Sequence, residues 1–208
     1  MTSPTPLRRQ PVQQRSAKRV QKMLEACAQL VDDLGYDGVT TTLIAERAGV
    51  AVGSLYQFFP DKRAVVQALT QRNLDYFIGE ISRRLDDANL DHWWDGADVA
   101  FDIYVEMYRE VPGFRRIRFG DVVDMRLIDD ERENNTVIAE SMATLLADRF
   151  QVSLADIRLR VAVANEIADG ILNLAFRRKL FPEDVVIAEA KKVVRGYLSG
   201  EMEPQPKA

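Results

Sequence analysis

Apolar residues recur every three or four positions along most of the chain, a spacing that places them on one face of an α-helix. The first such segment runs from Ser16, a suitable N-cap, to Gly35, which can end a helix because it accepts a left-handed backbone. Its predicted inward positions are Val20, Leu24, Cys27, Leu30, Val31 and Leu34. The pattern therefore predicts a long amphipathic helix near the start of the chain.

Two shorter helical segments follow, separated by Gly49. The first begins in the threonine cluster 40–42, and the second begins near Val52. Asp61 is placed to cap a longer helix over 62–85. The two short segments are too short to be stable alone, so we expect the long helices on either side to support them.

The rest of the chain is also predicted to be helical, and it has no β-hairpin signal. Ser153 and Pro182 are the expected starting points of the last two long helices. The predicted helices in this part are His92 to Glu110, Phe114 to Asp121, Asp124 or Asp129 to Phe150, Leu154 to about Lys179, and Pro182 to about Ser199. The sequence therefore predicts an all-α protein of about nine helices.

The composition is that of an ordinary globular protein, with 208 residues of which 47% are hydrophobic and 29% are charged. It has no apolar run long enough to cross a membrane and no signal peptide, so we expect a cytoplasmic protein that does not enter a membrane. Cys27 is the single cysteine, which excludes an internal disulfide. Because Cys27 lies on the apolar stripe of the first helix, we interpret it as a core residue.

The formal net charge is −4, but the charge is unevenly distributed. Residues 1–63 hold nine Lys and Arg against six Asp and Glu, a net charge of +3. No acidic residue accompanies the six basic residues among the first 22, which are Arg8, Arg9, Arg15, Lys18, Arg19 and Lys22. For residues 1–14, a basic arm that binds nucleic acid and a solvated flexible tail are both open.

The stretch from Thr41 to Lys62 reads as a helix, a glycine turn and a second helix. Ala45 and Ala48 are small enough to let the two helices cross closely, and Gly49 suits the tight turn of a helix-turn-helix. An ordinary helical hairpin would share this general shape. The residue types are more specific: Thr-Thr at the helix start, Ile-Ala after it, Ala-Gly-Val at the turn and Leu-Tyr-x-x-Phe-x-x-Lys at the end.

These residues closely resemble the DNA-binding domain of the tetracycline repressor-like (TetR) family. The resemblance covers about residues 16–64 and implies an N-terminal three-helix DNA-binding domain with a helix-turn-helix. A larger helical domain for ligand binding and dimerisation would follow it. The implied organisation is a flexible basic arm at 1–15, the DNA-binding domain at 16–64, the effector-binding and dimerisation domain at 65–200, and a flexible tail at 201–208.

The resemblance also implies a set of DNA-binding residues. In this family, residues in the positions of Thr41, Thr42, Tyr56 and Lys62 bind the phosphate backbone, and Lys18 and Arg19 lie where the first helix can reach a neighbouring phosphate. Positions 52–54 approach base edges. Gln57 could pair with adenine, and Val52 could meet a thymine methyl group. The expected DNA-binding residues are Thr41, Thr42, Val52, Gly53, Ser54, Tyr56, Gln57 and Lys62.

The same resemblance implies a homodimer, paired through the last two long helices, that binds a palindromic operator in double-stranded DNA. Its two recognition helices would lie roughly 34–36 Å apart. A small hydrophobic effector would tilt the fourth helix and release the DNA, so the chain would be a ligand-responsive repressor. The candidate effector-binding residues are Phe101, Tyr104, Tyr108, Asn165 and Asp169, on an aromatic-rich helix and on a helix with isolated polar groups. For Asn165, a contact between helices or between protomers is an open alternative.

The sequence shows few of the residue patterns that are typical of enzymes. The single histidine, His92, has no Glu-x-x-His partner pattern, and no Ser/His/Asp set or glycine-rich phosphate loop is visible. We therefore expect no catalytic residue, no metal site and no cofactor. One alternative to a DNA-binding regulator stays open, a helical protein that binds only a small molecule or a protein and whose helix-turn-helix is purely structural.

Overall fold

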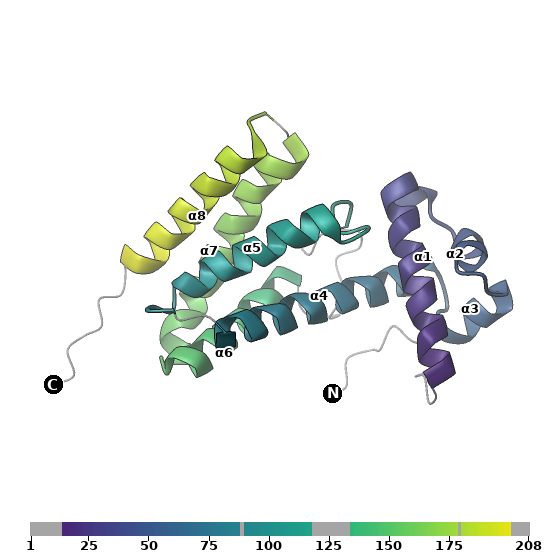
Figure 1. Cartoon of the computed structure of the whole chain (residues 1–208), viewed down its shortest axis with the longest axis horizontal. Helices are drawn as coiled ribbons and strands as arrows, with labels where there is room; N and C mark the ends of the chain where they lie inside the picture. The colour runs from purple at the N-terminus through teal and green to yellow at the C-terminus, as the bar shows by residue number, and fades with distance from the viewer. Residues whose placement is uncertain (1–13, 88–89, 118–133, 179, 201–208) are drawn as a thin grey trace. The chain divides into compact units, whose positions relative to one another are not determined.

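The computed structural model of the chain describes residues 14–87, 90–117, 134–178 and 180–200 (Figure 1). Within these ranges the structure consists of helices and their connections, without a β-strand. The helices are α1 Gln14–Gly38, α2 Thr41–Arg47, α3 Val52–Phe58, α4 Lys62–Asp87, α5 Asp95–Glu110, α6 Asn134–Phe150, α7 Leu154–Asn173 and α8 Glu183–Gly200, with a π-helical turn at Leu174–Arg178. The all-α prediction is confirmed. None of the helices in the described ranges combines the length and the apolar character that a membrane span requires.

Several helix boundaries differ from those expected. Gly35 has φ 70° and ψ 171° and breaks α1, as its residue type predicts, but helical structure continues beyond it to Gly38. The helix expected from His92 begins at Asp95, because residues 92–94 form a turn. The carbonyl group of Ser153 begins α7 by accepting from Asp156 N at 3.1 Å, but the Ser153 side chain makes no capping hydrogen bond, contrary to the prediction.

The prediction of a helix from Phe114 to Asp121 is wrong for residues 114–117, the part of this range that the structure describes. Residues 112–117 form turns, in which Phe114 N donates to Val111 O at 3.2 Å and Ile117 N donates to Gly113 O at 2.9 Å. Gly113 has φ +80°, so the backbone cannot continue from α5 into another helix at this point. Residues 118–133, including both proposed starts of the next helix, lie outside the described residues.

The chain divides into two compact units. We call them unit 1, which takes Met1–Asp75 and Met107–Asn134, and unit 2, which takes Tyr76–Glu106 and Asn135–Ala208. The divisions fall inside α4 and inside α5, so each of these two helices supplies residues to both units. The domain boundary expected near residue 64 stays a prediction.

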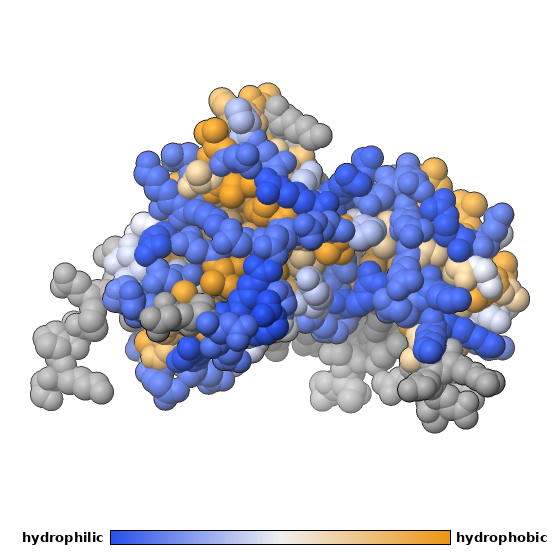
Figure 2. All heavy atoms as spheres, in the orientation of Figure 1, coloured by the Kyte–Doolittle hydropathy of each residue, from blue (hydrophilic) through white to orange (hydrophobic). Residues whose placement is uncertain are grey.

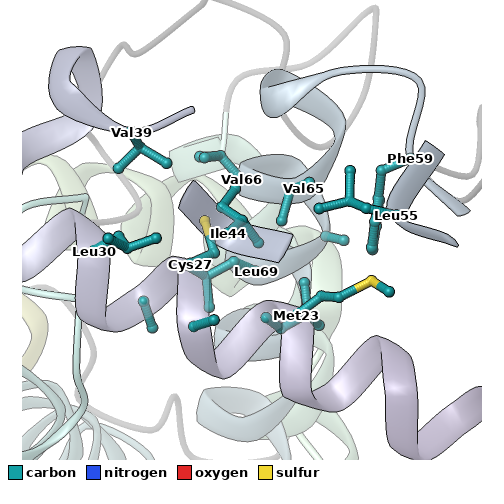
Figure 3. Packing of buried hydrophobic residues seen from close by; sticks show 14 of the residues in the cluster. Met23, Cys27, Leu30, Val39, Ile44, Leu55, Phe59, Val65, Val66 and Leu69 are labelled. Atoms are coloured by element: carbon teal, nitrogen blue, oxygen red, sulfur yellow. The ribbon is translucent and has the colours of Figure 1, made fainter. Parts of the chain in front are cut away.

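Unit 1 is built around one hydrophobic cluster drawn from α1, α2, α3 and the first half of α4 (Figure 3). Met23 and Cys27 of α1, Ile44 of α2 and Leu55 of α3 are all fully buried in it. Burial of a large aliphatic side chain stabilises a fold by about 1.5–3 kcal/mol. The short helices α2 and α3 are therefore held by shared packing, as their length requires.

Unit 2 has a core of its own, formed by the second part of α4 with α5, α6, α7 and α8. The helices α7 and α8 pack against each other as an antiparallel pair (Figure 1). Charged residues on α5 and α8 pair outside this core, where Arg195 binds Asp95 at 2.6 Å and Asp98 at 3.0 Å, and Lys191 binds Asp102. The sequence predicted the helices of this unit but not these partners.

Candidate nucleic-acid interface

The start of α2 is fixed by a threonine cap. Thr40 has extended backbone angles, and its Oγ1 accepts a hydrogen bond from Leu43 N at 3.2 Å. Thr41 and Thr42 are the first two helical residues, so their N–H groups have no acceptor within the helix. Thr41 is half-buried and Thr42 is exposed. A helix start of this kind leaves N–H groups and hydroxyls available for an anion.

The turn between α2 and α3 depends on Gly49, which has φ +65°. Gly49 N donates to Glu46 O at 3.0 Å, and Val50 N donates to Ala45 O at 2.9 Å. This pair of bonds is the Schellman motif, which closes a helix through a left-handed residue. Val50 then packs against the hydrophobic cluster, so the chain reverses in a few residues and enters α3 at a fixed angle.

The helix α3 divides cleanly into an inner and an outer face. Leu55 and Phe58 are buried, whereas Gly53, Tyr56 and Gln57 are exposed. Val52 and Ser54 are half-buried, and Val52 packs against the core cluster. Of the four residues predicted from the motif to face bases, Gly53 and Gln57 are therefore exposed, and Val52 and Ser54 are partly covered. No acidic residue lies within α3.

A hydrogen bond joins the two helices of the motif on their outer side. The Thr41 Oγ1 and Tyr56 Oη atoms lie 3.0 Å apart, and either hydroxyl can donate. The Tyr56 side chain is 42% exposed, so its ring forms part of the surface beside the start of α2. Two residues assigned to phosphate from the motif are thus brought together, a contact that sequence spacing alone did not predict.

Lys62 is placed differently from a freely solvated phosphate-binding lysine. Its Nζ donates to Tyr36 O at 3.1 Å and lies 4.3 Å from the centre of the Tyr36 ring. The Lys62 ammonium group therefore binds the end of α1 and holds it near the start of α4. The predicted cap of α4 is confirmed, since Asp61 Oδ1 accepts from Ala64 N at 2.8 Å. The role of Lys62 towards DNA stays a prediction.

Two acidic residues near the end of α1 are engaged by arginines. Arg47 Nη1 binds Asp33 Oδ2 at 2.9 Å, and Arg115 Nε binds Asp32 Oδ1 at 3.1 Å. The hydrogen bond to Asp32 raises the pKa of Arg115. At the other end of α1, Lys18, Arg19 and Lys22 are exposed. These positions give the exposed part of α1 before Glu25 a positive charge.

The residues predicted to bind an effector lie on α5 and α7. Phe101 is buried, and Tyr104, Asn165 and Asp169 are half-buried, all within unit 2. Tyr108 lies in the part of α5 that belongs to unit 1. The location of this candidate site stays a prediction.

Two aromatic residues outside the predicted effector-binding set lie beside Tyr104. The Tyr104 ring is edge-on to Phe77 and nearly parallel to Phe176, with ring centres 6.4 Å apart in each pair. Both phenylalanines are buried, and Phe176 lies on the π-helical turn after α7. Phe77 belongs to α4, outside the pair of helices expected to form the site, and Phe176 lies near the end of the helix expected from Leu154 to about Lys179. Their proximity to Tyr104 depends on packing.

Cys27 is a core residue, as its position on the apolar stripe predicts. It is fully buried, and burial raises the pKa of its thiol to about 12. The nucleophilic thiolate is therefore scarce at neutral pH. Among the described residues, no group of three or more His, Cys, Asp or Glu side chains is arranged to hold a metal ion.

Comparisons with known proteins cover both parts of the chain. Residues 23–69 match the sequence profile of bacterial regulatory proteins of the tetR family, and residues 91–202 match that of the tetracyclin repressor-like C-terminal domain. A TetR-family transcriptional regulator from Streptomyces coelicolor is 34% identical, with a TM-score of 0.76 over 88% of this chain and 99% of that one. The transcriptional regulator FadR from Bacillus subtilis, solved in complex with stearoyl-CoA, has a TM-score of 0.60 over 88% of this chain and 99% of that one. At 13% identity it shares the fold.

Curated relatives match over a shorter length. The HTH-type transcriptional regulator YvdT of Bacillus subtilis (strain 168) is 26% identical over 84 residues, which are 40% of this chain and 42% of that relative. The chain thus spans less than half the length of this relative. The two profiles nevertheless account for most of the sequence, and the second alone matches more than half of it. The chain belongs to the TetR family of bacterial transcriptional regulators.

Proposed function

We propose that this protein is a repressor that binds operator DNA as a homodimer and is released by a small hydrophobic effector. The observation that carries the DNA-binding part is the outer face of the helix-turn-helix. There the Thr41 and Tyr56 hydroxyls lie 3.0 Å apart beside the exposed start of α2. Two adjacent hydroxyls and the free N–H groups at a helix start can bind the same phosphate. Gly53 and Gln57, exposed on α3, then face the bases.

The electrostatics of unit 1 support this assignment. Exposed Lys18, Arg19 and Lys22 lie on α1, and α3 has no acidic residue that would repel phosphate. Asp32 and Asp33 are paired with arginines, which reduces the negative potential near the end of α1. Phosphate binding by basic residues releases counterions, so the affinity for duplex DNA should fall steeply as the salt concentration rises.

The test compares two exposed tyrosines. Tyr56→Ala should weaken binding to an operator duplex by about tenfold or more, because a hydrogen bond to a charged phosphate is lost. It should leave the slope of log affinity against log salt nearly unchanged, because a neutral hydroxyl displaces no counterion. Tyr76→Ala is the matched control, since the Tyr76 side chain is 53% exposed on α4 and outside the motif. Fluorescence anisotropy with a duplex selected from a random library measures both effects.

Lys62 requires a separate variant because it also binds Tyr36. Lys62→Ala should weaken DNA binding, and Lys62→Arg should retain most of it because the positive charge remains. Circular dichroism would show whether α1 and α4 stay folded in each variant. Wild-type affinity in both Tyr56→Ala and Lys62→Ala would contradict the assignment of these residues. A flat salt dependence in the wild type would instead favour a structural helix-turn-helix.

The homodimer is proposed to form through α7 and α8. Part of the apolar face of α7 is buried within the chain, including Ile157, Val161 and Ala164. Figure 2 shows hydrophobic surface near the connection between α7 and α8. The apolar side chains that remain exposed on α7, on α8 and between them are Leu154, Leu159, Leu180, Phe181, Val185 and Val193. An exposed apolar surface of this kind is typical of an interface.

The dimer has a direct test in these exposed positions. Leu159→Glu combined with Val193→Glu should convert the protein to a monomer in sedimentation velocity, because each carboxylate would have to be buried in the interface. Thr144→Glu combined with Gln151→Glu, at exposed polar positions of unit 2, is the control. A monomeric wild type at micromolar concentration, or an unchanged dimer in the Leu159 and Val193 variant, would contradict the proposal.

The effector is proposed to be largely apolar and to bind among the helices of unit 2. Support comes from the cluster of Phe77, Tyr104 and Phe176 and from the FadR fold relative, whose structure contains stearoyl-CoA. Stearoyl-CoA should therefore raise the melting temperature of this protein and weaken its DNA binding, with coenzyme A as the control for the head group. Tyr104→Trp and Asn165→Leu should reduce these effects without abolishing DNA binding. The cytoplasmic location expected from the sequence stays a prediction.

A further inference from the structure

Tyr36 lies in the last turn of α1, directly after the break at Gly35. It is half-buried and packs against the core cluster of unit 1, which fixes the backbone around it. The Tyr36 carbonyl oxygen accepts two hydrogen bonds, from Val39 N at 3.2 Å and from Lys62 Nζ at 3.1 Å. One carbonyl group therefore closes the turn that leads towards α2 and also binds the first side chain of α4.

The Lys62 ammonium group is held by two different parts of Tyr36. While it donates to the carbonyl oxygen, Nζ also lies 4.3 Å from the centre of the Tyr36 ring. A cation over the face of an aromatic ring is attracted by the ring electrons, and the carbonyl groups at the end of a helix are favourable acceptors for a lysine. Lys62 is itself half-buried, so this lysine has less conformational freedom than an exposed one.

The start of α4 does not by itself favour a lysine. A positive charge is unfavourable at the N-terminus of a helix, and the capping hydrogen bond is supplied by Asp61, whose Oδ1 accepts from Ala64 N at 2.8 Å. An ammonium group has three N–H donors, and one of them binds the Tyr36 carbonyl oxygen. A phosphate group can therefore bind through the others while the contact between Lys62 and Tyr36 persists.

We propose that Tyr36 is a positioning residue for DNA binding and that it acts through Lys62. This rests on the proposed function, in which Lys62 binds a phosphate group. A lysine that is fixed before DNA arrives has already lost side-chain freedom, so DNA binding does not have to offset that loss. The ring supplies the specific part of this restraint, because a carbonyl group is present whichever residue occupies position 36.

Two substitutions separate the ring from the rest of the side chain. Tyr36→Leu removes the ring but keeps an apolar side chain against the core cluster, and it should weaken binding to an operator duplex by about fivefold. Tyr36→Phe keeps the ring face and should bind the duplex as the wild type does. Tyr76→Leu is the matched control, since Tyr76 is a 53% exposed tyrosine that belongs to unit 2.

A double-mutant cycle shows whether Tyr36 acts through Lys62. In the Lys62→Ala background, Tyr36→Leu should change the DNA affinity by less than about twofold, because no ammonium group is left to position. In the Tyr56→Ala background, the full loss of about fivefold should persist, because Tyr56 makes a separate contact. An equal loss with and without Lys62 would show that Tyr36 acts through the packing of unit 1 and would overturn the proposal.

The restraint on Lys62 can also be measured without DNA, by acetylation of lysine amines in the full-length protein and mass spectrometry. In the free wild type, Lys62 should react at least about threefold more slowly than the exposed Lys18 and Lys22, because its contact with Tyr36 shields the amine. Tyr36→Leu should accelerate the reaction at Lys62 and leave Lys18 and Lys22 unchanged. Tyr36→Phe should keep Lys62 slow.

The acetylation rates separate failure of this proposal from failure of the proposed function. If Lys62 reacts as fast as Lys22 in the free wild type, Tyr36 does not restrain it and the proposal is overturned, even if Tyr36→Leu fails to fold. An operator duplex should slow acetylation of Lys62 further. If Lys62 is slow in the free protein but gains no protection from bound DNA, its phosphate contact is contradicted, and with it the role of Tyr36. A wild type that binds no duplex contradicts the proposed function itself.

Discussion

Units 1 and 2 are both helical, but they depend on the sequence in different ways. In unit 1, single residues fix the backbone: Thr40 and Asp61 cap helices, and Gly49 supplies the left-handed residue of the turn. In unit 2, long helices are defined by apolar stripes, and a stripe does not reveal what covers it. Local chemistry thus specifies the shape of the helix-turn-helix, whereas the arrangement of the other helices depends on contacts far apart in the sequence.

The end of α5 shows this difference most clearly. Its sequence suggested another helix from Phe114, but Gly113 turns the chain, and Phe114 and Ile117 enter the core of unit 1. Part of the apolar face of α7, a helix expected to pair with a second protomer, is likewise covered within the chain. In both places the hydrophobic pattern predicted burial correctly, but the identity of the covering surface came from the fold.

The largest expected difference between the units concerns their cores. Leu55→Ala in unit 1 and Ile103→Ala in unit 2 each remove a fully buried side chain and should each cost about 2–5 kcal/mol. Cys27 is a probe of unit 1, and Trp93 and Trp94, the only tryptophans, are probes of unit 2. Leu55→Ala should accelerate thiol labelling of Cys27 by about 30-fold or more.

The variant in unit 2, Ile103→Ala, should affect the tryptophan probe of unit 2 more than the Cys27 probe of unit 1. Ile103→Ala should lower the urea midpoint of tryptophan fluorescence and accelerate Cys27 labelling by only about threefold. If both variants changed the Cys27 labelling rate and the urea midpoint equally, the two units would unfold together. The two units would then not differ in stability. Labelling at pH 7 with a large excess of reagent makes the opening of unit 1 the measured quantity, because burial suppresses the thiolate in the folded state.

Replacing one glycine by alanine in each unit should change the free energy of unfolding in opposite directions. Gly49→Ala should destabilise unit 1 by about 1–2 kcal/mol, because a Cβ is unfavourable at φ +65° although the space around it is open. Gly79→Ala, in the interior of α4 within unit 2, should stabilise the fold by about 0.5–1 kcal/mol, because its Cβ would also meet open space. Chemical denaturation measures both, and stabilisation by Gly49→Ala would refute the proposed need for a left-handed residue.

The smallest expected effect concerns pH and belongs to unit 2. Hydrogen bonds from Arg83 and Arg84 lower the pKa of Glu80 from 4.5 to about 2. Because the folded pKa lies below the unfolded one, this carboxylate stabilises the fold above about pH 4.5, and the contribution is lost as the pH falls towards 2. The ion pairs are partly exposed, so we expect at most about 1 kcal/mol.

Glu80→Gln should therefore reduce the acid-induced loss of stability in unit 2, measured by tryptophan fluorescence during urea unfolding at pH values between 5 and about 2. Glu189→Gln is the control, since the Glu189 carboxylate lies 3.7 Å from Lys192 in a loose and exposed pair. An identical pH profile for Glu80→Gln and the wild type would show that this network adds no measurable stability.

The sequence by itself determined the helical class, the positions of most helices and the geometry of the helix-turn-helix. It could do so because caps, glycine turns and the helical repeat act over a few neighbouring residues. Gly49, Thr40 and Asp61 perform in the structure the roles that their residue types predict. The set of DNA-binding positions came from the same local motif, and it remains a set of predictions.

Only the tertiary structure decided which distant groups meet. The Thr41–Tyr56 hydrogen bond, the binding of Lys62 to Tyr36 and the contact of Gly113 with Ala28 join residues whose separation along the chain carries no signal of proximity. Each depends on the way whole helices pack, and packing minimises exposed apolar surface over the entire unit and not within a short window. For this reason the sequence predicted the recognition helix, and the fold alone revealed that the turn after α5 packs against α1.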